Sequence, residues 1–231
     1  MRILAVIPAR GGSKGVPKKN SKLLGKKPLI AYTINDAKNS KLLTEIVVST
    51  DDQEIASQAE IAGCKPPFVR PAELAMDTST SLEVVQHALS FFESINIFFD
   101  AVCLLQPTSP FRPQGFIDKA IEKFIASQSD SLVSVLPIPN EFNPHWAFEE
   151  NEIGLLQIAT GEKNIITRRQ ELPRAFYRDG AVYITKTEVI KNGSLYGEAI
   201  AYIESNPQFH VNIDTLEDWE KAEKLLTLMK L

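Results

Sequence analysis

Short apolar runs alternate with amphipathic stretches along most of this 231-residue chain. Residues 3–7 form an unbroken apolar run, ILAVI, whose β-branched members are typical of a buried strand in a parallel sheet. Similar runs predict further strands at 45–50, 101–105, 131–136, 181–184 and 200–203. Apolar positions at helical spacing predict helices at 28–38, 53–62, 80–92, 116–124 and 215–228. This alternation predicts an α/β fold with a Rossmann-like, doubly wound, mostly parallel sheet.

Polar residues at three of the predicted helix starts are suited to cap the helix N-terminus. They are Asp51–Asp52, Thr80 with Glu83, and Thr215 with Asp218. The acidic pair at 51–52 is also compatible with catalysis, but capping is favoured because the pair lies between a predicted strand and a predicted helix. We therefore expect Asp51 and Asp52 to stabilise the chain rather than to act on a substrate.

The alternation is interrupted between about residues 140 and 178. Prolines bracket this segment, which holds Phe142, Trp146 and Phe148 among short mixed runs. We expect short strands and irregular chain there, with apolar side chains that need a partner surface. Because no internal repeat or long linker divides the sequence, we predict a single domain, residues 1–231, with an insertion at about 140–178.

The overall charge and the cysteine content narrow the class of protein. A formal net charge of −4 and a pI near 5.5 argue against a general nucleic-acid or membrane-surface binder, since such partners attract basic surfaces. Cys64 and Cys103 form neither a metal motif nor a disulfide framework, so we expect two reduced thiols. With no signal peptide or transmembrane run visible, we expect a soluble cytoplasmic protein.

The first predicted strand is followed by a glycine-rich, cationic loop. Three glycines alternate there with four cations: Arg10, Gly11, Gly12, Lys14, Gly15, Lys18 and Lys19. Glycine lets backbone N–H groups approach a ligand, and the cations supply charge for a polyphosphate at the carboxyl end of the strand. We therefore predict a phosphate site. The spacing matches neither a P-loop nor G-x-G-x-x-G, and a solvated basic turn is the alternative.

Seven motifs, taken together, resemble those of the CMP-sialic acid synthetases (acylneuraminate cytidylyltransferases). They follow the family's order over nearly the whole chain: IPARGGSKGVPKKN at 7–20, IVVSTDDQEIA at 46–56, RPAELAMDTSTS at 70–81, LLQPTSPFR at 104–112, RRQELPRAF at 168–176, DGAVYI at 179–184 and NIDTLEDW at 212–219. The resemblance implies a fold of the nucleotide-diphospho-sugar transferase type, in which the insertion is an arm exchanged across a homodimer. It also implies a magnesium-dependent reaction of CTP with a sialic-acid-like 2-keto sugar acid, which yields the CMP-sugar and pyrophosphate.

Nucleotidyl transfer requires cations for the leaving pyrophosphate, charge neutralisation at the α-phosphorus and an aligned acceptor hydroxyl. In the cationic loop we assign Arg10 and Lys14 to the outer phosphates and Lys19 to the reacting phosphate. The amide of Asn20 has both donors and an acceptor for a base or ribose. The resemblance implies that the nucleotide-binding residues are Pro8, Ala9, Arg10, Lys19, Asn20, Arg70 and Ser81.

The acceptor sugar is expected beside the polar turn that follows the strand at 101–105. The sugar-binding candidates are Gln106, Thr108, Ser109, Arg169 and Tyr183. Arg112, Arg168 and Arg178 are further candidates for holding an acidic sugar, because guanidinium binds carboxylates bidentately. An ordinary proline-framed turn is the alternative for residues 106–110. The three histidines are scattered and form neither a catalytic triad nor a metal cluster.

The metal candidates lie before the last predicted helix. Family members typically carry the pattern D-x-D there, whereas this chain has Asn212-Ile213-Asp214. Residues at i and i+2 of an extended segment point the same way, so we predict Asp214 as the principal Mg²⁺ ligand and Asn212 as a second candidate. The alternative role for Asp214 is a helix cap. The catalytic candidates are therefore Arg10, Lys14, Lys19 and Asp214.

Two other functions compete with a cytidylyltransferase. A nicotinamide-dependent oxidoreductase would use a similar sheet, but the missing G-x-G-x-x-G and the cationic loop count against it. A non-catalytic nucleotide-binding homologue is compatible with Asn212 in place of an aspartate.

Overall fold

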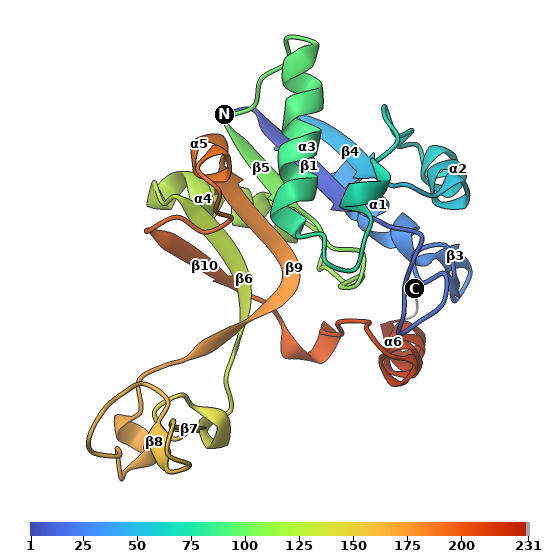
Figure 1. Ribbon diagram of the computed structural model, residues 1–231. Coiled ribbons are helices and arrows are strands. Elements are labelled where there is room, and N and C mark those ends of the chain that lie inside the picture. Colours follow the sequence, from blue (N-terminus) through green and yellow to red (C-terminus); the bar gives the residue numbers. More distant parts are fainter. Residues whose placement is uncertain (230–231) are drawn as a thin grey trace.

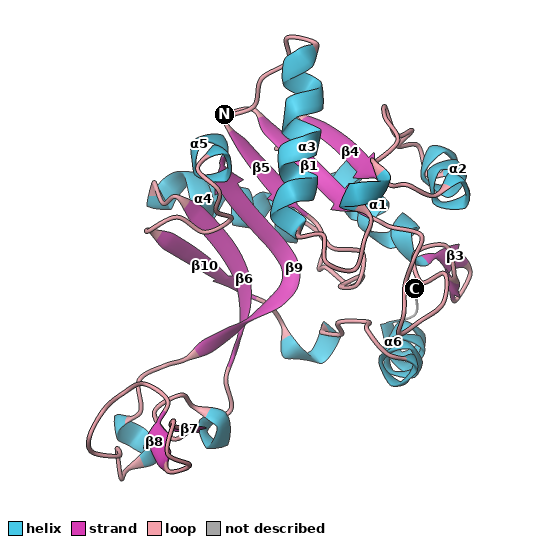
Figure 2. Ribbon diagram, viewed as in Figure 1, coloured by secondary structure: helices cyan, strands magenta, loops and turns pink. Residues whose placement is uncertain are grey.

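The computed structural model describes residues 1–229 and contains a central six-stranded sheet with helices on both faces (Figure 1, Figure 2). The strands of this sheet are β1 (Ile3–Pro8), β4 (Glu45–Ser49), β5 (Ala101–Leu104), β6 (Ser131–Pro137), β9 (Phe176–Lys186) and β10 (Ile200–Glu204). Their order in the sheet is β10-β6-β9-β5-β1-β4. Because β1 is parallel to β4 and β5, and β10 is parallel to β6, the predicted mostly parallel α/β fold is confirmed.

Strand β9 is the exception to the parallel arrangement. It is antiparallel to both β5 and β6, and it is much longer than the run predicted at 181–184. The buried stretch Ala181–Ile184 of β9 is an apolar run like those of the parallel strands, so it carries no signal of strand direction. The pairing with β6 shifts register between Val133 and Val135, and at this irregularity the Ser134 hydroxyl donates to the buried carboxylate of Asp179.

The five predicted helices begin within one residue of the predicted positions, and a further short helix at Thr187–Lys191 was not predicted. The helices are α1 (Leu29–Asn39), α2 (Gln53–Ile61), α3 (Ser81–Ser94), α4 (Phe116–Ser127), α5 (Thr187–Lys191) and α6 (Leu216–Met229). Asp52 caps α2 by accepting from the Ile55 N–H at 2.9 Å, and Thr80 with Glu83 forms a capping box on α3. Asp51 is not a cap, because its carboxylate accepts from the Gly11 N–H at 3.1 Å instead. None of the helices described is both long and apolar enough to cross a membrane.

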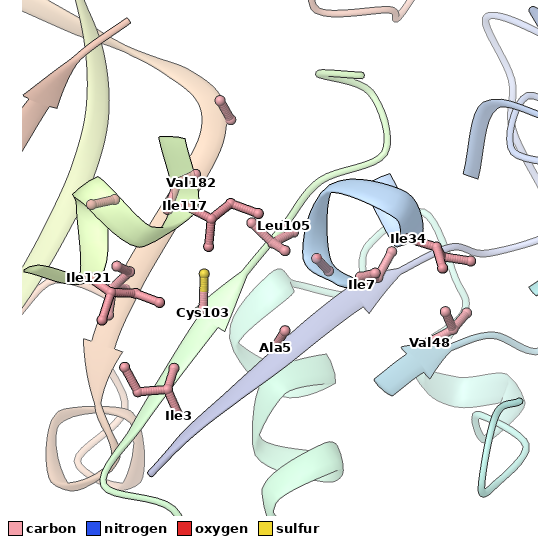
Figure 3. Packing of buried hydrophobic residues seen from close by; sticks show 14 of the residues in the cluster. Ile3, Ala5, Ile7, Ile34, Val48, Cys103, Leu105, Ile117, Ile121 and Val182 are labelled. Atoms are coloured by element: carbon pink, nitrogen blue, oxygen red, sulfur yellow. The ribbon is translucent and has the colours of Figure 1, made fainter. Parts of the chain in front are cut away.

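The alternation of side chains along β1 divides the core between two faces of the sheet. Ile3, Ala5 and Ile7 pack with apolar residues of α1 and α4, as Figure 3 shows, whereas Leu4 and Val6 pack against α3. Cys103 lies within the first of these clusters, and burial raises the pKa of its thiol to about 12. Both cysteines are buried and free, as expected.

A third apolar cluster anchors the cationic loop to the last helix. Val16 of the loop is fully buried there against Ile213, which precedes α6, and Trp219, within α6. The short strands β2 (Leu23–Leu24) and β3 (Lys27–Pro28) follow the loop. Two segments almost 200 residues apart in sequence are thereby fixed side by side, which brings the cations of the loop close to the metal candidates.

Residues 138–175 project from the sheet between β6 and β9 (Figure 1), and we call this segment the arm. It contains the hairpin of β7 (Phe148–Glu150) and β8 (Leu156–Ile158) and the short 3₁₀ turns at Asn140–Phe142 and Arg169–Glu171. Several large apolar side chains of the arm are exposed: Phe142, Phe148, Ile153, Leu155, Leu156 and Ile165. The arm therefore has apolar surface that one chain leaves uncovered.

Candidate active site

A cavity of about 310 Å³ opens at the carboxyl edge of the sheet, beyond the ends of β1 and β5. Most of the predicted site residues line it together with the N-terminus of α3. Its lining consists of Pro8, Arg10, Ser13, Lys14, Gly15, Lys19, Asn20, Arg70, Ser79, Thr80, Ser81, Val84, Gln106, Pro107, Thr108 and Asp214. Parallel strands that end at one edge bring these sequence-distant residues together.

The glycines of the loop permit close packing against the protein itself. A Cβ at Gly15 would overlap the backbone carbonyl oxygen of Asp214, and one at Gly11 would lie 2.7 Å from a carboxylate oxygen of Asp52. A Cβ at Gly12, in contrast, would meet open space. The sequence predicts that these glycines let backbone N–H groups approach a ligand. Two of the three instead allow the loop to lie against the two acidic segments beside it.

Three of the four loop cations lie at the cavity, and an aspartate already neutralises two of them. Asp77 accepts from Arg10 Nη2 at 2.7 Å and also pairs with Lys14. Lys14 and then Arg10 lower the pKa of this exposed carboxyl. Lys18 is outside the cavity, because its Nζ pairs with Glu54 at 2.8 Å.

Lys19 is the most enclosed cation of the loop. Only 13% of its side chain is exposed, and its Nζ donates to the Ile213 carbonyl at 2.6 Å and to Asp214 Oδ1 at 3.0 Å. The other carboxylate oxygen of Asp214 accepts from Asn212 Nδ2 at 2.7 Å. As predicted from their i and i+2 spacing, the side chains at 212 and 214 lie side by side.

Asp214 does not cap α6. The N–H of Asp218 donates to Thr215 Oγ1 at 3.2 Å, and the Asp218 carboxylate accepts from the N–H of Thr215 at 3.0 Å. This reciprocal pair occupies the helix start as the sequence predicted. Since the side chain of Asp214 is 62% exposed beside the cavity, its carboxylate is accessible to a ligand.

All of the predicted nucleotide residues except Ala9 line the cavity. Arg70 is buried, with Nε donating to Ser49 Oγ at 3.0 Å and Nη2 to the Ser49 carbonyl, and burial lowers its pKa to about 10. Asn20 Nδ2 donates to the Arg10 carbonyl at 3.0 Å. Ala9 is fully buried and does not line the cavity, but its N–H donates to the Ser49 carbonyl.

The sugar candidates divide into two groups. Gln106 and Thr108 line the cavity, whereas Ser109 faces away and donates to the Asp179 carbonyl at 3.2 Å. Tyr183 is buried in the apolar cluster on the α3 side of the sheet, and burial raises its pKa to about 12. Within one chain neither Ser109 nor Tyr183 reaches the cavity.

The arginine candidates also lie elsewhere. The arm carries Arg168 and Arg169, both exposed and outside this cavity. Arg178 donates to the Tyr196 hydroxyl at 2.8 Å. The expectation that Arg112 binds the sugar carboxylate is wrong for this chain, because its guanidinium is buried and bonded to protein oxygens. Sequence cannot distinguish a buried arginine from an exposed one when the partners are backbone carbonyls.

Sequence reasoning missed Asp179 and Asp77. Asp179 is buried beneath the turn that holds Gln106 and Ser109, and its Oδ1 accepts from the Ala181 N–H at 3.1 Å. In the sequence, the pair Asp179-Gly180 directly precedes an apolar run, and this pattern could have indicated a buried carboxylate at the start of that run. Asp77 had no comparable signal, since only the tertiary structure brings it to the cationic loop.

A magnesium ion is compatible with this donor set only if a substrate supplies other ligands. Among residues 1–229 no three His, Cys, Asp or Glu side chains are grouped so that they could hold a metal. Asp214 offers a hard anionic oxygen at the cavity, and Mg²⁺ usually retains waters and binds one or two carboxylates plus substrate phosphates. The residues present therefore fit an ion that binds together with a polyphosphate.

Comparisons with known proteins agree with this geometry. The family model described as "Cytidylyltransferase" matches residues 4–231. The chain is 41% identical to a CMP-N,N'-diacetyllegionaminic acid synthase of Legionella pneumophila over 99% of this chain and 97% of that protein. It is 36% identical to a pseudaminic acid cytidylyltransferase of Campylobacter jejuni over 97% and 96% of the two chains. The solved structure of CMP:2-keto-3-deoxy-manno-octonic acid synthetase with CTP is similar in fold, with a TM-score of 0.72 at 18% identity and full coverage of both chains.

Proposed function

The chain belongs to the cytidylyltransferase family, and from that premise we propose that it activates a sialic-acid-like 2-keto sugar acid with CTP. In this reaction a sugar hydroxyl oxygen attacks the α-phosphorus, and the bond from that phosphorus to the β-phosphate oxygen breaks. The hydroxyl proton is lost, and the products are the CMP-sugar and pyrophosphate. The observation that carries the proposal is a single cavity that combines Arg10, Lys14 and Lys19 with Asp214. Two free cysteines are consistent with a reducing cytoplasm as the location.

Arg10 and Lys14 are suited to hold the β- and γ-phosphates. Both now pair with Asp77, so an incoming polyphosphate would exchange one anionic partner for another. Arg10 donates in the fixed geometry of a guanidinium, whereas the largely exposed Lys14 acts as a mobile point charge. As the pyrophosphate leaves, its growing negative charge is stabilised by the same two cations.

Lys19 and Asp214 are suited to act at the reacting phosphate. The Ile213 carbonyl and the Asp214 carboxylate hold Lys19 Nζ at the edge of the cavity, so its charge is oriented before substrate binds. Asp214 would hold Mg²⁺, with Asn212 adjacent, and the ion would neutralise charge on the α-phosphate when bound. The chain itself contributes a fixed cation and a fixed anion on the same side of the cavity.

The cytidine pocket is proposed at Arg70, Asn20 and Ser81. Arg70 has five N–H donors, and the bonds to Ser49 use two of them. Arg70 and Asn20 both line the cavity and carry N–H donors, and cytosine presents O2 and N3 as acceptors. We therefore expect CTP to bind more tightly than ATP or GTP, which calorimetric titration measures. Equal or tighter binding of a purine nucleotide would remove cytidine as the ligand.

The reaction is tested by pyrophosphate release. The protein is incubated with CTP, Mg²⁺ and, in turn, N-acetylneuraminate, a legionaminate and a pseudaminate; controls omit the acceptor or replace CTP by ATP. We expect acceptor-dependent release with CTP only. CTP binding without release for any acceptor would support the non-catalytic homologue instead.

We further propose a homodimer in which the arm of a second copy completes the sugar side of the cavity. In one chain the arm projects from the sheet (Figure 1). Phe142 and Ile153 of the arm are exposed, and Arg169, which the arm also carries, is not among the residues that line the cavity. A two-fold interface would bury such a surface in both copies at once. Light scattering should give the dimer mass, and a variant with Ile153→Ser and Leu156→Ser should shift toward monomer while it retains CTP affinity. A monomer mass for the unmodified protein would contradict this proposal.

A further inference from the structure

The side chain of Arg112 connects three elements behind the cavity. Only 1% of it is exposed, and it donates from Nε to the Ala181 carbonyl and from Nη2 to the Gln106 carbonyl, both at 2.8 Å. Its Nη1 donates to Thr33 Oγ1 at 3.1 Å and lies 3.5 Å from Asp36 Oδ2. One guanidinium thus joins the turn after β5, the strand β9 and the helix α1.

The two carbonyls that accept from Arg112 belong to two segments that pack against each other, the turn after β5 and the strand β9. Gln106 lines the cavity, and Ala181 follows Gly180, which has a φ of +82°. A Cβ at Gly180 would lie only 3.0 Å from Gln106 Oε1 and 2.9 Å from Ser109 Oγ. The turn therefore lies directly on the backbone of β9, and the distance between them determines where the Gln106 amide points.

We propose that Arg112 is a positioning residue for the acceptor: it fixes Gln106 at the sugar side of the cavity without touching the sugar. This inference rests on the proposed function for what Gln106 contacts. A lysine cannot replace Arg112, since one ammonium lacks the rigid, planar fork that reaches two carbonyls and a hydroxyl in different directions. The cytidine side depends on Arg70, Asn20 and α3, and none of their hydrogen bonds described here involves Arg112.

The test compares the unmodified protein with Arg112→Lys and with Thr33→Val. The valine variant is the matched control, because it removes one partner of the same guanidinium but leaves both carbonyl bonds intact. Three quantities are measured for each: the CTP Kd by calorimetry, kcat and the sugar-acid KM, and backbone ¹⁵N relaxation of Gln106, Thr108 and Ser109. Melting temperatures accompany all three.

For Arg112→Lys we expect kcat/KM for the sugar acid to fall about tenfold or more, while the CTP Kd stays within about twofold. Its amides at 106, 108 and 109 should become mobile, whereas Thr33→Val should lose melting temperature but keep the sugar KM and the rigid turn. Parallel losses of CTP affinity and sugar kcat/KM in both variants would reduce Arg112 to a structural residue.

The proposal can still be tested if no sugar acid reacts, and also if Arg112→Lys does not fold. If no sugar acid reacts, the proposed function fails, but the relaxation data and CTP Kd still decide whether Arg112 orders the turn. If Arg112→Lys does not fold, the unmodified protein decides. Gln106 must then be as rigid as the neighbouring residues of β5 and β9, and a turn mobile on the nanosecond timescale overturns the proposal.

Discussion

Asp36, the counter-ion of Arg112, should make the folded state less stable as the pH rises. Asp36 lies on α1 with 26% of its side chain exposed, and its Oδ2 is 3.5 Å from Arg112 Nη1. Burial raises the pKa of this carboxyl from 3.8 to about 6, although Arg112 opposes the rise. Because the folded state binds the proton more tightly than the unfolded state, stability should fall as the pH rises from about 4 through about 6. Asp36→Asn removes this titration and keeps an oxygen acceptor for Arg112.

The size of the effect follows from the two pKa values. A difference of about two units at about 1.4 kcal/mol per unit corresponds to about 3 kcal/mol over the whole titration. Roughly half of it, about 1.5 kcal/mol, falls between about pH 5 and about pH 7.5. The quantity to compare is the unfolding free energy of the unmodified protein minus that of Asp36→Asn. This difference should be about 1.5 kcal/mol lower at about pH 7.5 than at about pH 5.

Urea denaturation of both proteins at the two pH values and constant ionic strength measures this difference. Asp130→Asn is the control, because backbone N–H groups and Lys186 lower the pKa of Asp130, so its titration ends below the tested range. The difference between unmodified protein and this control should be the same at both pH values. If the Asp36→Asn difference were also independent of pH, Arg112 would hold Asp36 ionised throughout, and the reasoning from burial would be refuted.

The other predictions concern the cavity. Lys19→Ala and Arg10→Ala should each lose about 2–4 kcal/mol of transition-state stabilisation, seen as a 30-fold or greater drop in pyrophosphate release at saturating CTP. Near-normal turnover would remove that residue from the catalytic set. Asp214→Asn should lose most activity and recover part of it at raised Mg²⁺ with little change in melting temperature; a less stable protein that keeps its rate would make Asp214 structural. Gly15→Ala should weaken CTP binding about tenfold or more in calorimetry, because its Cβ would overlap the Asp214 carbonyl, whereas Gly12→Ala should change the Kd less than about twofold. Equal effects of the two alanines would show that loop packing does not shape the phosphate site.

Local patterns in the sequence were enough to locate most elements and their ends. The apolar run at 3–7 specifies a buried strand wherever it lies, and a capping residue such as Thr80 acts on N–H groups within three positions of itself. The cationic loop was likewise predictable, since glycines and cations that follow a first strand must emerge at the carboxyl edge of the sheet. These inferences succeed because the interactions involved are short in sequence.

The tertiary structure alone decided which polar groups meet. Gly15 contacts the Asp214 carbonyl, and Lys19 donates to the Asp214 carboxylate. Both contacts form because Val16 and Ile213 pack in one apolar cluster, and the sequence of neither segment predicts that packing. Arg112 belongs to a motif that suggests a surface anion site, yet its side chain is buried and donates to the Ala181 carbonyl of β9 and to the Gln106 carbonyl in the turn after β5. Every residue has a backbone carbonyl, so the sequence does not show which carbonyls accept from an arginine. Only the three-dimensional structure shows that Arg112 is buried behind the cavity and supports the turn that lines it.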